Sequence, residues 1–429
     1  MLRAIGISLF AASLFAAMAT PLMAADCPAP RESNTTEFGD HRRPHWTIDH
    51  TDNRNRTYPG SDSTRTPPLL AAFQRFRVMR KPETSATGWT VTLRDEQQRV
   101  LQVLRPSHFT SEAATTGVWT RFVKASAVTF DVFAEPGAVV ALIAKEAIVL
   151  SDKAYIPRYS WLGPTAAYVP LYSFRHTDFE TVRRAGDRVA FIVGRDEAEM
   201  NGAFRGVSWC CSGILLTDTL LLTNWHCGGR SMARPDEMWR DDSDGRICDS
   251  LLIDMARDDA SPSREARCTK VEHVDKSRDY ALLRVAPVGG GLQTLSTGRP
   301  VRFARTPLQD GARLRIIHHP ECLEKRISFN CPVSQRIRAA WDGDARNPQS
   351  EFAHLCDTEG GSSGAPVFNE ASELVGLHHL GHELIPGDPR QTCDKQNKAI
   401  HIEAVMSDIK AGKPDLYREI RAATDGLPE

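Results

Sequence analysis

Short apolar runs separated by glycine, proline and polar residues recur through most of this chain, and they limit it to folds built largely from strands. Trp89–Leu93 and Val128–Phe133 alternate apolar and polar residues, as half-buried strands do. Four later runs have similar lengths and similar turn signals: Gly213–Leu216, Leu220–Thr223, Tyr280–Val285 and Leu374–Leu377. Short strands at such intervals are typical of antiparallel barrels, so the sequence predicts an all-β fold.

Helical spacing of apolar residues is confined to a few segments. Ile402 to Ile409 and Leu416 to Ala422 have this spacing, which predicts a C-terminal helix that closes the β-rich body. The apolar stretch from Val139 to Leu150 has an ambiguous period and fits a helix as well as a strand. The polar stretch from Cys27 to Pro68 has too few aliphatic groups to offset its ordering entropy, so we expect an extended arm.

The overall charge excludes a general attraction to polyanions. The 429 residues include 53 Lys and Arg against 54 Asp and Glu, a net charge of −1. A nearly neutral chain has no global attraction for nucleic acid or for an anionic bilayer. Arginine pairs such as Arg183-Arg184 also lack the interleaved aromatic residues of a nucleic-acid site. We therefore expect no nucleic-acid partner.

The first residues have the three parts of a secretory signal. Arg3 is followed by an apolar run from Ile5 to Ala19 and then by small residues up to Ala25. We expect cleavage near Ala24 or Ala25, and the alternative is an uncleaved membrane anchor, for which the apolar run is short. A secreted or periplasmic location suits the ten cysteines, because disulfides persist there. After cleavage no membrane contact is expected.

Three chemically distinct residues stand at the edges of apolar runs. His226 ends one run, Asp279 directly precedes the run that begins at Tyr280, and Ser363 lies in a glycine-rich turn. A serine hydroxyl needs a base to take its proton, and the base needs a carboxylate to fix its tautomer. Asp275 is the competing acid, but the apolar run that follows Asp279 favours Asp279.

The ordered motifs Thr-x-x-His-Cys, Asp-x-Ala-Leu-Leu and Gly-x-Ser-Gly-x-Pro resemble the trypsin/chymotrypsin family of serine peptidases. The resemblance covers roughly Gly186 to Gly412 and implies two six-stranded β-barrels with the site in the cleft between them. It implies that Ser363 is the nucleophile, His226 the general base and then acid, and Asp279 the orienting carboxylate. The N–H groups of Gly361 and Ser363 would form the oxyanion hole.

The cysteines add two hypotheses. The resemblance implies a disulfide between Cys211 and Cys227, with the adjacent Cys210 as the rival partner of Cys227. Nine cysteines lie in the peptidase region and only Cys27 lies before it, so an isolated peptidase would have an odd thiol. Either Cys27 ties the arm to the peptidase domain, or one cysteine stays free.

The substrate preference rests on residues before and after the nucleophile in the sequence. Animal members carry directly before the nucleophile an aspartate that receives the new N-terminus on activation, whereas Ser362 makes this chain more similar to bacterial lysyl and glutamyl endopeptidases. Asp357 matches the acid that pairs with a basic P1 side chain, whereas Thr358 and His378 fall where glutamyl endopeptidases bind a P1 glutamate. Because Asp357 would repel a glutamate, the sequence favours Lys or Arg at P1, with Glu as the alternative.

Three further histidines are potential metal ligands, but the sequence around them does not predict a metal site. His378, His379 and His382 lie together in the sequence without an evident set of acidic or cysteine ligands. We therefore expect no metal and no other cofactor.

The sequence thus predicts three parts: a signal peptide at 1–25, an extended arm with a β-rich pro-region or accessory domain at 26–185, and a trypsin-like serine peptidase domain at 186–429. The expected function is a secreted serine endopeptidase that hydrolyses polypeptides through an acyl-enzyme, made as a zymogen if the pro-region is removed. The alternative, from another class, is an inactive member of the same fold that serves in binding or adhesion.

Overall fold

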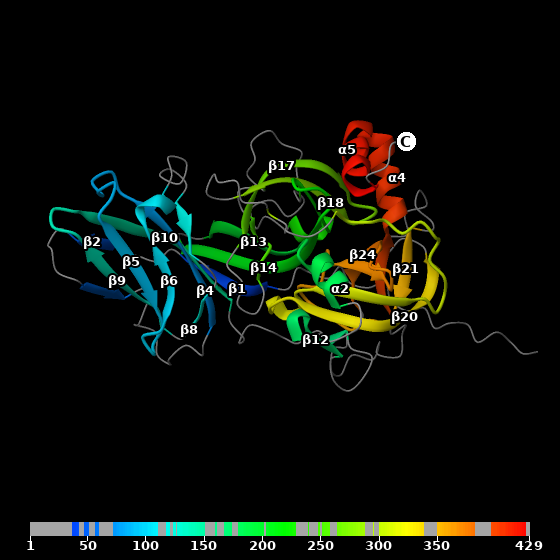
Figure 1. Ribbon diagram of the computed structural model, residues 1–429, viewed down its shortest axis with the longest axis horizontal. Coiled ribbons are helices and arrows are strands. Elements are labelled where there is room, and N and C mark those ends of the chain that lie inside the picture. The colour runs from blue at the N-terminus through cyan, green and yellow to red at the C-terminus, as the bar shows by residue number, and fades with distance from the viewer. Residues whose placement is uncertain are drawn as a thin grey trace, which may run out of the picture.

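The computed structural model describes residues 37–42, 47–50, 56–59, 72–109, 117–120, 123–125, 127–150, 159–160, 167–173, 179–200, 203–228, 239, 248, 251–257, 264–287, 295, 300–338, 350–381 and 396–425 (Figure 1). The expected signal peptide, Cys27, His382 and Cys393 lie outside these residues. Within them, no helix combines the length and the apolar character that crossing a bilayer requires.

Six strands form a first closed barrel. Each runs antiparallel to its neighbours in the order β13-β16-β17-β18-β15-β14, and β14 pairs back onto β13. The bounds are β13 (Val189–Met200), β14 (Ala203–Leu215), β15 (Leu220–Thr223), β16 (Leu252–Asp254), β17 (Glu265–Asp275) and β18 (Tyr280–Pro287). The strand β15 is buried throughout, as expected for a short run of three leucines and a threonine.

A second barrel closes in the same way. Its order is β20-β19-β23-β24-β25-β21, and β21 pairs back onto β20. The bounds are β19 (Arg313–His318), β20 (Arg326–Arg338), β21 (Glu351–His354), β23 (Pro366–Asn369), β24 (Leu374–Leu380) and β25 (Asn397–His401). The predicted pair of six-stranded barrels is therefore confirmed.

Two C-terminal helices follow the second barrel, as predicted. They are α4 (Ile402–Gly412) and α5 (Pro414–Asp425). Val405 and Ile409 of α4 join one apolar core with Leu282 of the first barrel and Leu377 of the second. A third helix, α2 (Phe179–Gly186), was not predicted, because its single short apolar face gives little periodic signal.

A β-rich part precedes the barrels. A four-stranded sheet, in the order β3-β9-β5-β6, packs its apolar face against strands β2, β4 and β10. The bounds are β1 (Glu37–Arg42), β2 (Thr47–His50), β3 (Arg56–Pro59), β4 (Ala72–Arg80), β5 (Trp89–Arg94), β6 (Val100–Leu104), β7 (Val118–Trp119), β8 (Val123–Ala125), β9 (Thr129–Ala134) and β10 (Val140–Leu150). The polar arm thus supplies three strands.

The apolar stretch that fitted either a helix or a strand forms the strand β10. It pairs with β4 along most of its length, and β1 and β2 pair with its other edge. Both faces of its first half are withdrawn from water, which hides the period of two: Val140 and Leu142 are buried on one face, while Ala141 is buried and Ile143 half-buried on the other.

The N-terminal part and the barrels are continuous at three places. The strand β1 pairs with β14 of the first barrel, which joins the two sheets (Figure 1). The strand β12 (Tyr168–Pro170) pairs with β20 of the second barrel, and β11 (Tyr159–Ser160) pairs with β22 (Thr358–Glu359). Residues before the expected boundary at 186 therefore take part in sheets with the peptidase region.

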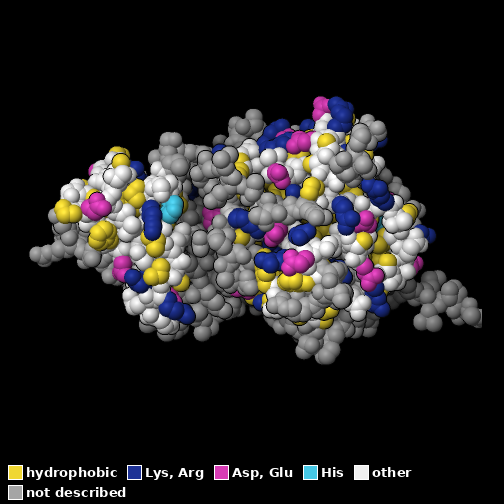
Figure 2. Space-filling view, in the orientation of Figure 1, with side chains coloured by type: hydrophobic (Ala, Val, Ile, Leu, Met, Phe, Trp, Pro, Cys, Tyr) yellow, Lys and Arg dark blue, Asp and Glu magenta, His cyan; other side chains and the backbone are white. Residues whose placement is uncertain are grey.

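The surface mixes charges of both signs. On the face shown in Figure 2, Lys and Arg side chains are interspersed with Asp and Glu side chains over the described residues. This distribution fits the near-zero net charge of the chain.

Four disulfides link the described cysteines: Cys210–Cys322, Cys211–Cys227, Cys248–Cys268 and Cys331–Cys356. Cys210, the rival partner of Cys227, instead connects β14 of the first barrel to the turn after β19 of the second. Eight of the ten cysteines are thereby paired. The two alternatives for Cys27, a tether to this region or a free cysteine, both stay predictions, and Cys393 is the remaining candidate partner.

Replacing Cys210 and Cys322 together by alanine should lower the free energy of unfolding by about 4 to 5 kcal/mol, because this disulfide closes a loop of 112 residues. The matched control replaces Cys248 and Cys268, whose separation is 20, and should lose about 3 kcal/mol. Denaturant unfolding measures both. A larger loss in the control would contradict the loop-closure explanation.

Candidate active site

Two adjacent strands bring His226 and Asp279 together. In the antiparallel pair β15 and β18, Thr223 lies opposite Ala281. The residues that follow Thr223 therefore meet the residues that precede Ala281. His226 lies three residues after Thr223, in the 3-10 turn Trp225–Gly228, and Asp279 lies two residues before Ala281.

The Asp279 carboxylate is buried and receives several donors. Its Oδ2 lies 2.7 Å from His226 Nδ1, and its Oδ1 accepts the backbone N–H of His226 at 2.9 Å. Asn224 Nδ2 donates to the backbone oxygen of Asp279 at 2.9 Å. Burial acts to raise the pKa of Asp279, but His226 and His379 outweigh it and hold this pKa at about 2.

The competing acid is engaged elsewhere. Asp275 accepts hydrogen bonds from Ser277 Oγ at 2.7 Å and from the N–H of Arg278 at 3.0 Å, and it pairs with the Arg278 guanidinium. Of the two acids considered from the sequence, Asp279 is therefore the one that contacts His226.

Ser363 lies in a turn between β22 and β23 that requires glycine on both sides. Gly361 has φ +93° and Gly364 has φ +82°. A Cβ atom at Gly361 would clash with His319 O, and one at Gly364 would clash with Ser212 O. The close approach of backbone to backbone thus excludes side chains at both positions.

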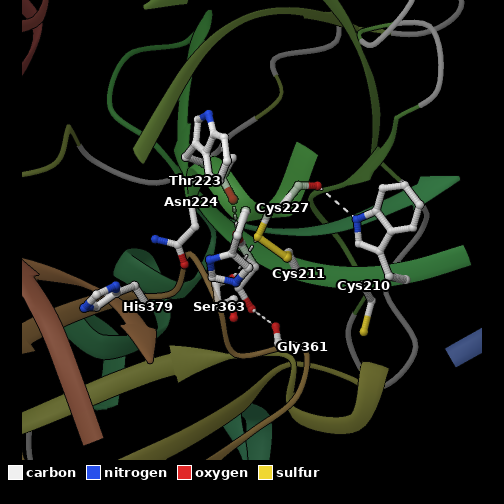
Figure 3. The surroundings of a disulfide bond; sticks show 12 residues. Cys210, Cys211, Thr223, Asn224, Cys227, Gly361, Ser363 and His379 are labelled. Carbon is white, nitrogen blue, oxygen red and sulfur yellow. Dashed lines mark hydrogen bonds between the residues drawn. A yellow bond between two sulfur atoms is a disulfide. The ribbon is translucent and has the colours of Figure 1, made fainter. Parts of the chain in front are cut away.

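The first barrel holds this turn next to His226. Ser212 N–H donates to Ser363 O at 2.7 Å, and Ser212 Oγ donates to Gly361 O at 2.8 Å. Ser212 follows Cys211, whose disulfide partner Cys227 follows His226. Figure 3 shows Gly361 and Ser363 beside this disulfide. Ser363 is half-buried, and the His226 side chain is 15% exposed, so both remain open to a ligand.

The amides of the turn divide into two sets. Ser362 N–H donates to Glu359 O at 2.9 Å, and Gly364 N–H donates to His378 O at 2.8 Å. No described residue accepts a hydrogen bond from the N–H of Gly361 or of Ser363. Backbone N–H groups that are withdrawn from water normally have an acceptor. Because the described residues supply none for these two, both N–H groups are available to bind an anionic oxygen.

Ser362 anchors the turn through a buried histidine. Its Oγ lies 2.7 Å from His318 Nδ1 and accepts the N–H of Glu359 at 3.1 Å. Burial lowers the pKa of His318 to about 3, so its ring is neutral. Because Ser328 Oγ donates to a backbone oxygen, it accepts the proton of His318 Nε2 at 3.2 Å. The Nδ1 atom is then free of a proton and accepts from Ser362.

Replacing Ser362 by alanine should lower the free energy of unfolding by about 1 to 3 kcal/mol, because His318 Nδ1 and the N–H of Glu359 both lose a partner. Ser334→Ala is the control, since the buried Ser334 Oγ has no described hydrogen-bond partner. It should change stability by less than about 0.5 kcal/mol. Equal effects of the two variants in denaturant unfolding would refute the anchoring role.

The three residues expected to bind P1 are all buried. Asp357 is 6% exposed, and its Oδ2 accepts the N–H of Ala167 at 2.8 Å. Thr358 is fully buried, and its Oγ1 has no described hydrogen-bond partner. His378 Nδ1 lies 3.2 Å from His354 Nε2, and burial lowers the pKa of His378 well below its usual value, so this ring is neutral.

Two functional candidates were missed by sequence reasoning. His379 contacts Asp279, and His318 holds Ser362, whereas the sequence raised His379 only as a metal ligand. Adjacent histidines on a strand point to opposite faces, so the pair His378-His379 already implied two different environments.

One group of potential metal ligands occurs in the described part of the chain. Ligand atoms of Cys211, His226 and Cys227 lie within 4.8 Å of one another. Cys211 and Cys227 are joined in a disulfide, so neither can supply the thiolate through which a cysteine binds a metal. The group is explained by the disulfide beside His226.

One family model matches part of the chain. Residues 211–377 match the sequence model of the family described as trypsin-like peptidase domain, a match that includes His226, Asp279 and Ser363. The matched residues are less than half of the 429, and over them the chain is similar to that family. The match does not distinguish the bacterial lysyl and glutamyl endopeptidases, so that subtype stays a prediction.

Two curated proteins are similar over part of the chain. An uncharacterized protein, y4fB, of Sinorhizobium fredii is 26% identical over 178 residues, which are 40% of this chain and 25% of that protein. Secreted RxLR effector protein 73 of Plasmopara viticola is 27% identical over 212 residues, 47% of this chain and 46% of that protein. The chain thus spans a quarter to about half of these relatives.

Solved structures show a weak likeness. The Rv3671c protease from M. tuberculosis, in its active form, has 14% identity and a TM-score of 0.37, with 58% of this chain and 91% of that chain covered. The serine endoprotease from Yersinia pestis has 15% identity and a TM-score of 0.37, with coverages of 56% and 67%.

Proposed function

We propose that this protein is an exported serine endopeptidase. The observation that carries the proposal is a pair of amides, of Gly361 and Ser363, for which the described residues supply no acceptor, in a turn held against the hydrogen-bonded side chains of His226 and Asp279. Such a turn can form an oxyanion hole next to a general base, here His226, and acyl transfer requires both. The match to the trypsin-like peptidase domain supports the same class of reaction.

In the proposed reaction, Ser363 Oγ attacks the carbonyl carbon of the scissile peptide and gives its proton to His226. The Nδ1 atom of His226 donates to Asp279, which leaves Nε2 to accept this proton. The oxyanion of the tetrahedral intermediate accepts the N–H groups of Gly361 and Ser363, each worth about 3 kcal/mol. His226 then protonates the leaving amine, and water hydrolyses the ester by the reverse steps.

A fluorophosphonate probe should label the wild-type protein at Ser363, because the probe needs an activated serine next to an oxyanion notch. Ser363→Ala should abolish labelling and lower kcat by about a million-fold. Ser334→Ala, outside the site, should be labelled like the wild type. Labelled protein is measured by mass spectrometry, and an unlabelled wild type would favour the inactive binding or adhesion protein.

We further propose a basic P1 preference. The buried carboxylate of Asp357 lies directly before the β22 strand that leads to the catalytic turn, and it favours a cation over a glutamate. Glutamate is the second candidate, because Thr358 Oγ1 lacks a described partner and the neutral ring of His378 can donate a hydrogen bond.

Sequencing the new ends made from one denatured protein tests this preference. Cuts after Lys or Arg are expected, and Asp357→Asn should lower kcat/KM for them by at least about 30-fold, because a buried charge pair loses one partner. Thr358→Val is the matched variant and should matter less. Cuts after Glu would contradict the assignment of Asp357 as the residue that binds P1, and would instead assign this role to Thr358 and His378.

The proposed location is the periplasm or the outside of the cell. The four disulfides of the described part persist in an oxidising compartment, which supports this location. We also propose that the β-rich N-terminal part acts as an accessory domain rather than a removed pro-region, because the pairing of β1 with β14 makes its sheet continuous with the first barrel.

A further inference from the structure

A second histidine contacts the acid of the proposed catalytic group. His379 Nδ1 lies 3.2 Å from Asp279 Oδ2, the oxygen that also contacts His226. On its other side, His379 Nε2 lies 3.5 Å from Glu351 Oε1. The side chains of His379 and Glu351 are each 2% exposed, so this chain of groups is screened from water.

The imidazole between two buried carboxylates carries a positive charge. Burial acts to lower the pKa of His379, but Glu351 and Asp279 outweigh it and raise this pKa to about 9. The other titratable groups near His379 are His354 on β21 and His378 on its own strand, whose pKa values burial lowers, and His226 beyond Asp279. The buried cation is therefore His379.

The contact joins the two barrels at the site. Asp279 and His226 belong to the first barrel, whereas His379 on β24, Glu351 on β21 and the turn of Ser363 belong to the second. His379 is thus a charged contact between the acid and the barrel that carries the proposed nucleophile. Figure 3 shows His379 on the same side of the disulfide as Asn224 and Ser363.

Resting on the proposed function, we propose that His379 is a positioning residue: held by Glu351, it fixes the Asp279 carboxylate in the orientation that receives the His226 ring. The positive charge of His379 also weakens the attraction of Asp279 for a protonated His226. Glu351 has the opposite charge but lies on the far side of the His379 ring from Asp279, so it offsets this effect only in part. His379 therefore orients Asp279 and neutralises some of its charge.

Two double variants separate the hydrogen bond from the charge. His379→Asn with Glu351→Gln removes both buried charges together, and the introduced side-chain amide keeps a donor at the distance of Nδ1 from the backbone. His379→Leu with Glu351→Gln is the matched variant without the donor. The joint change avoids an unpaired buried carboxylate, which would unfold the protein for an unrelated reason.

The asparagine variant should keep kcat within about threefold of the wild type, whereas the leucine variant should lose about 10- to 100-fold in kcat at nearly unchanged KM. In both variants the acidic limb of the kcat/KM profile should move to higher pH, because the cation beside Asp279 is gone. If kcat per titrated active site and the acidic limb match the wild type in both, and only the melting temperature falls, His379 is merely structural.

A second measurement does not depend on turnover. In Ser363→Ala protein with ¹⁵N-labelled histidine, NMR should show His379 protonated on both ring nitrogens at pH 7.5 and losing a proton near pH 9. A neutral His379 ring at pH 7.5 would overturn the proposal even if the double variants do not fold. Failure of the proposed function is seen separately, as a wild type that the fluorophosphonate probe does not label.

Discussion

The burial of the Asp279 carboxylate is the constraint on which the rest of the site depends. A buried charge that lacks a partner costs several kcal/mol, so its surroundings must supply donors. They do so from both barrels, through the ring and backbone N–H of His226 and through the ring of His379. Asp279 also has φ +46°, which is rare for a residue other than glycine. The backbone is held there by the hydrogen bond from Asn224 to its carbonyl.

A second constraint is the close packing of backbone around the Ser363 turn. Ser212 of the first barrel binds both Gly361 O and Ser363 O, while the buried hydrogen bond from Ser362 to His318 fixes the other side of the turn. The turn is thereby fixed from both barrels without an acidic residue at position 362. Because both neighbouring glycines have positive φ and no room for a Cβ, the amides of Gly361 and Ser363 keep one orientation.

Local patterns predicted much of the fold. The leucine-rich run Leu220–Thr223 and the helical spacing after Ile402 appear in the structure as β15 and α4. The period of Val139–Leu150 was uninformative because residues 140–144 of β10 are buried or half-buried on both faces, and the short helix α2 offered too few turns to be recognised. The local sequence therefore identified two kinds of element: short strands that are buried throughout, such as β15, and helices long enough to show one apolar face, such as α4.

The sequence predicted those site residues that stand in a recognisable local pattern, namely a serine between glycines and a histidine at the end of a strand. The choice between Asp275 and Asp279 was made from the apolar run that follows Asp279. In the structure, the register of β15 against β18 is what brings Asp279 to His226. The role of His379 depends on its contact with Asp279 of the other barrel, and that of Glu351 depends on its contact with His379. The residues next to His379 and Glu351 in the sequence give no sign of these contacts.

The pairing of β1 with β14 has a consequence for folding. Without β1, one edge of β14 in the stretch from 206 to 209 would present unpaired N–H and C=O groups, and an open edge is a template for association with another chain. The strand β1 thus covers an edge at which the first barrel would otherwise be open to such association. Since β1 is synthesised before β14, it is already part of the chain when that edge first forms.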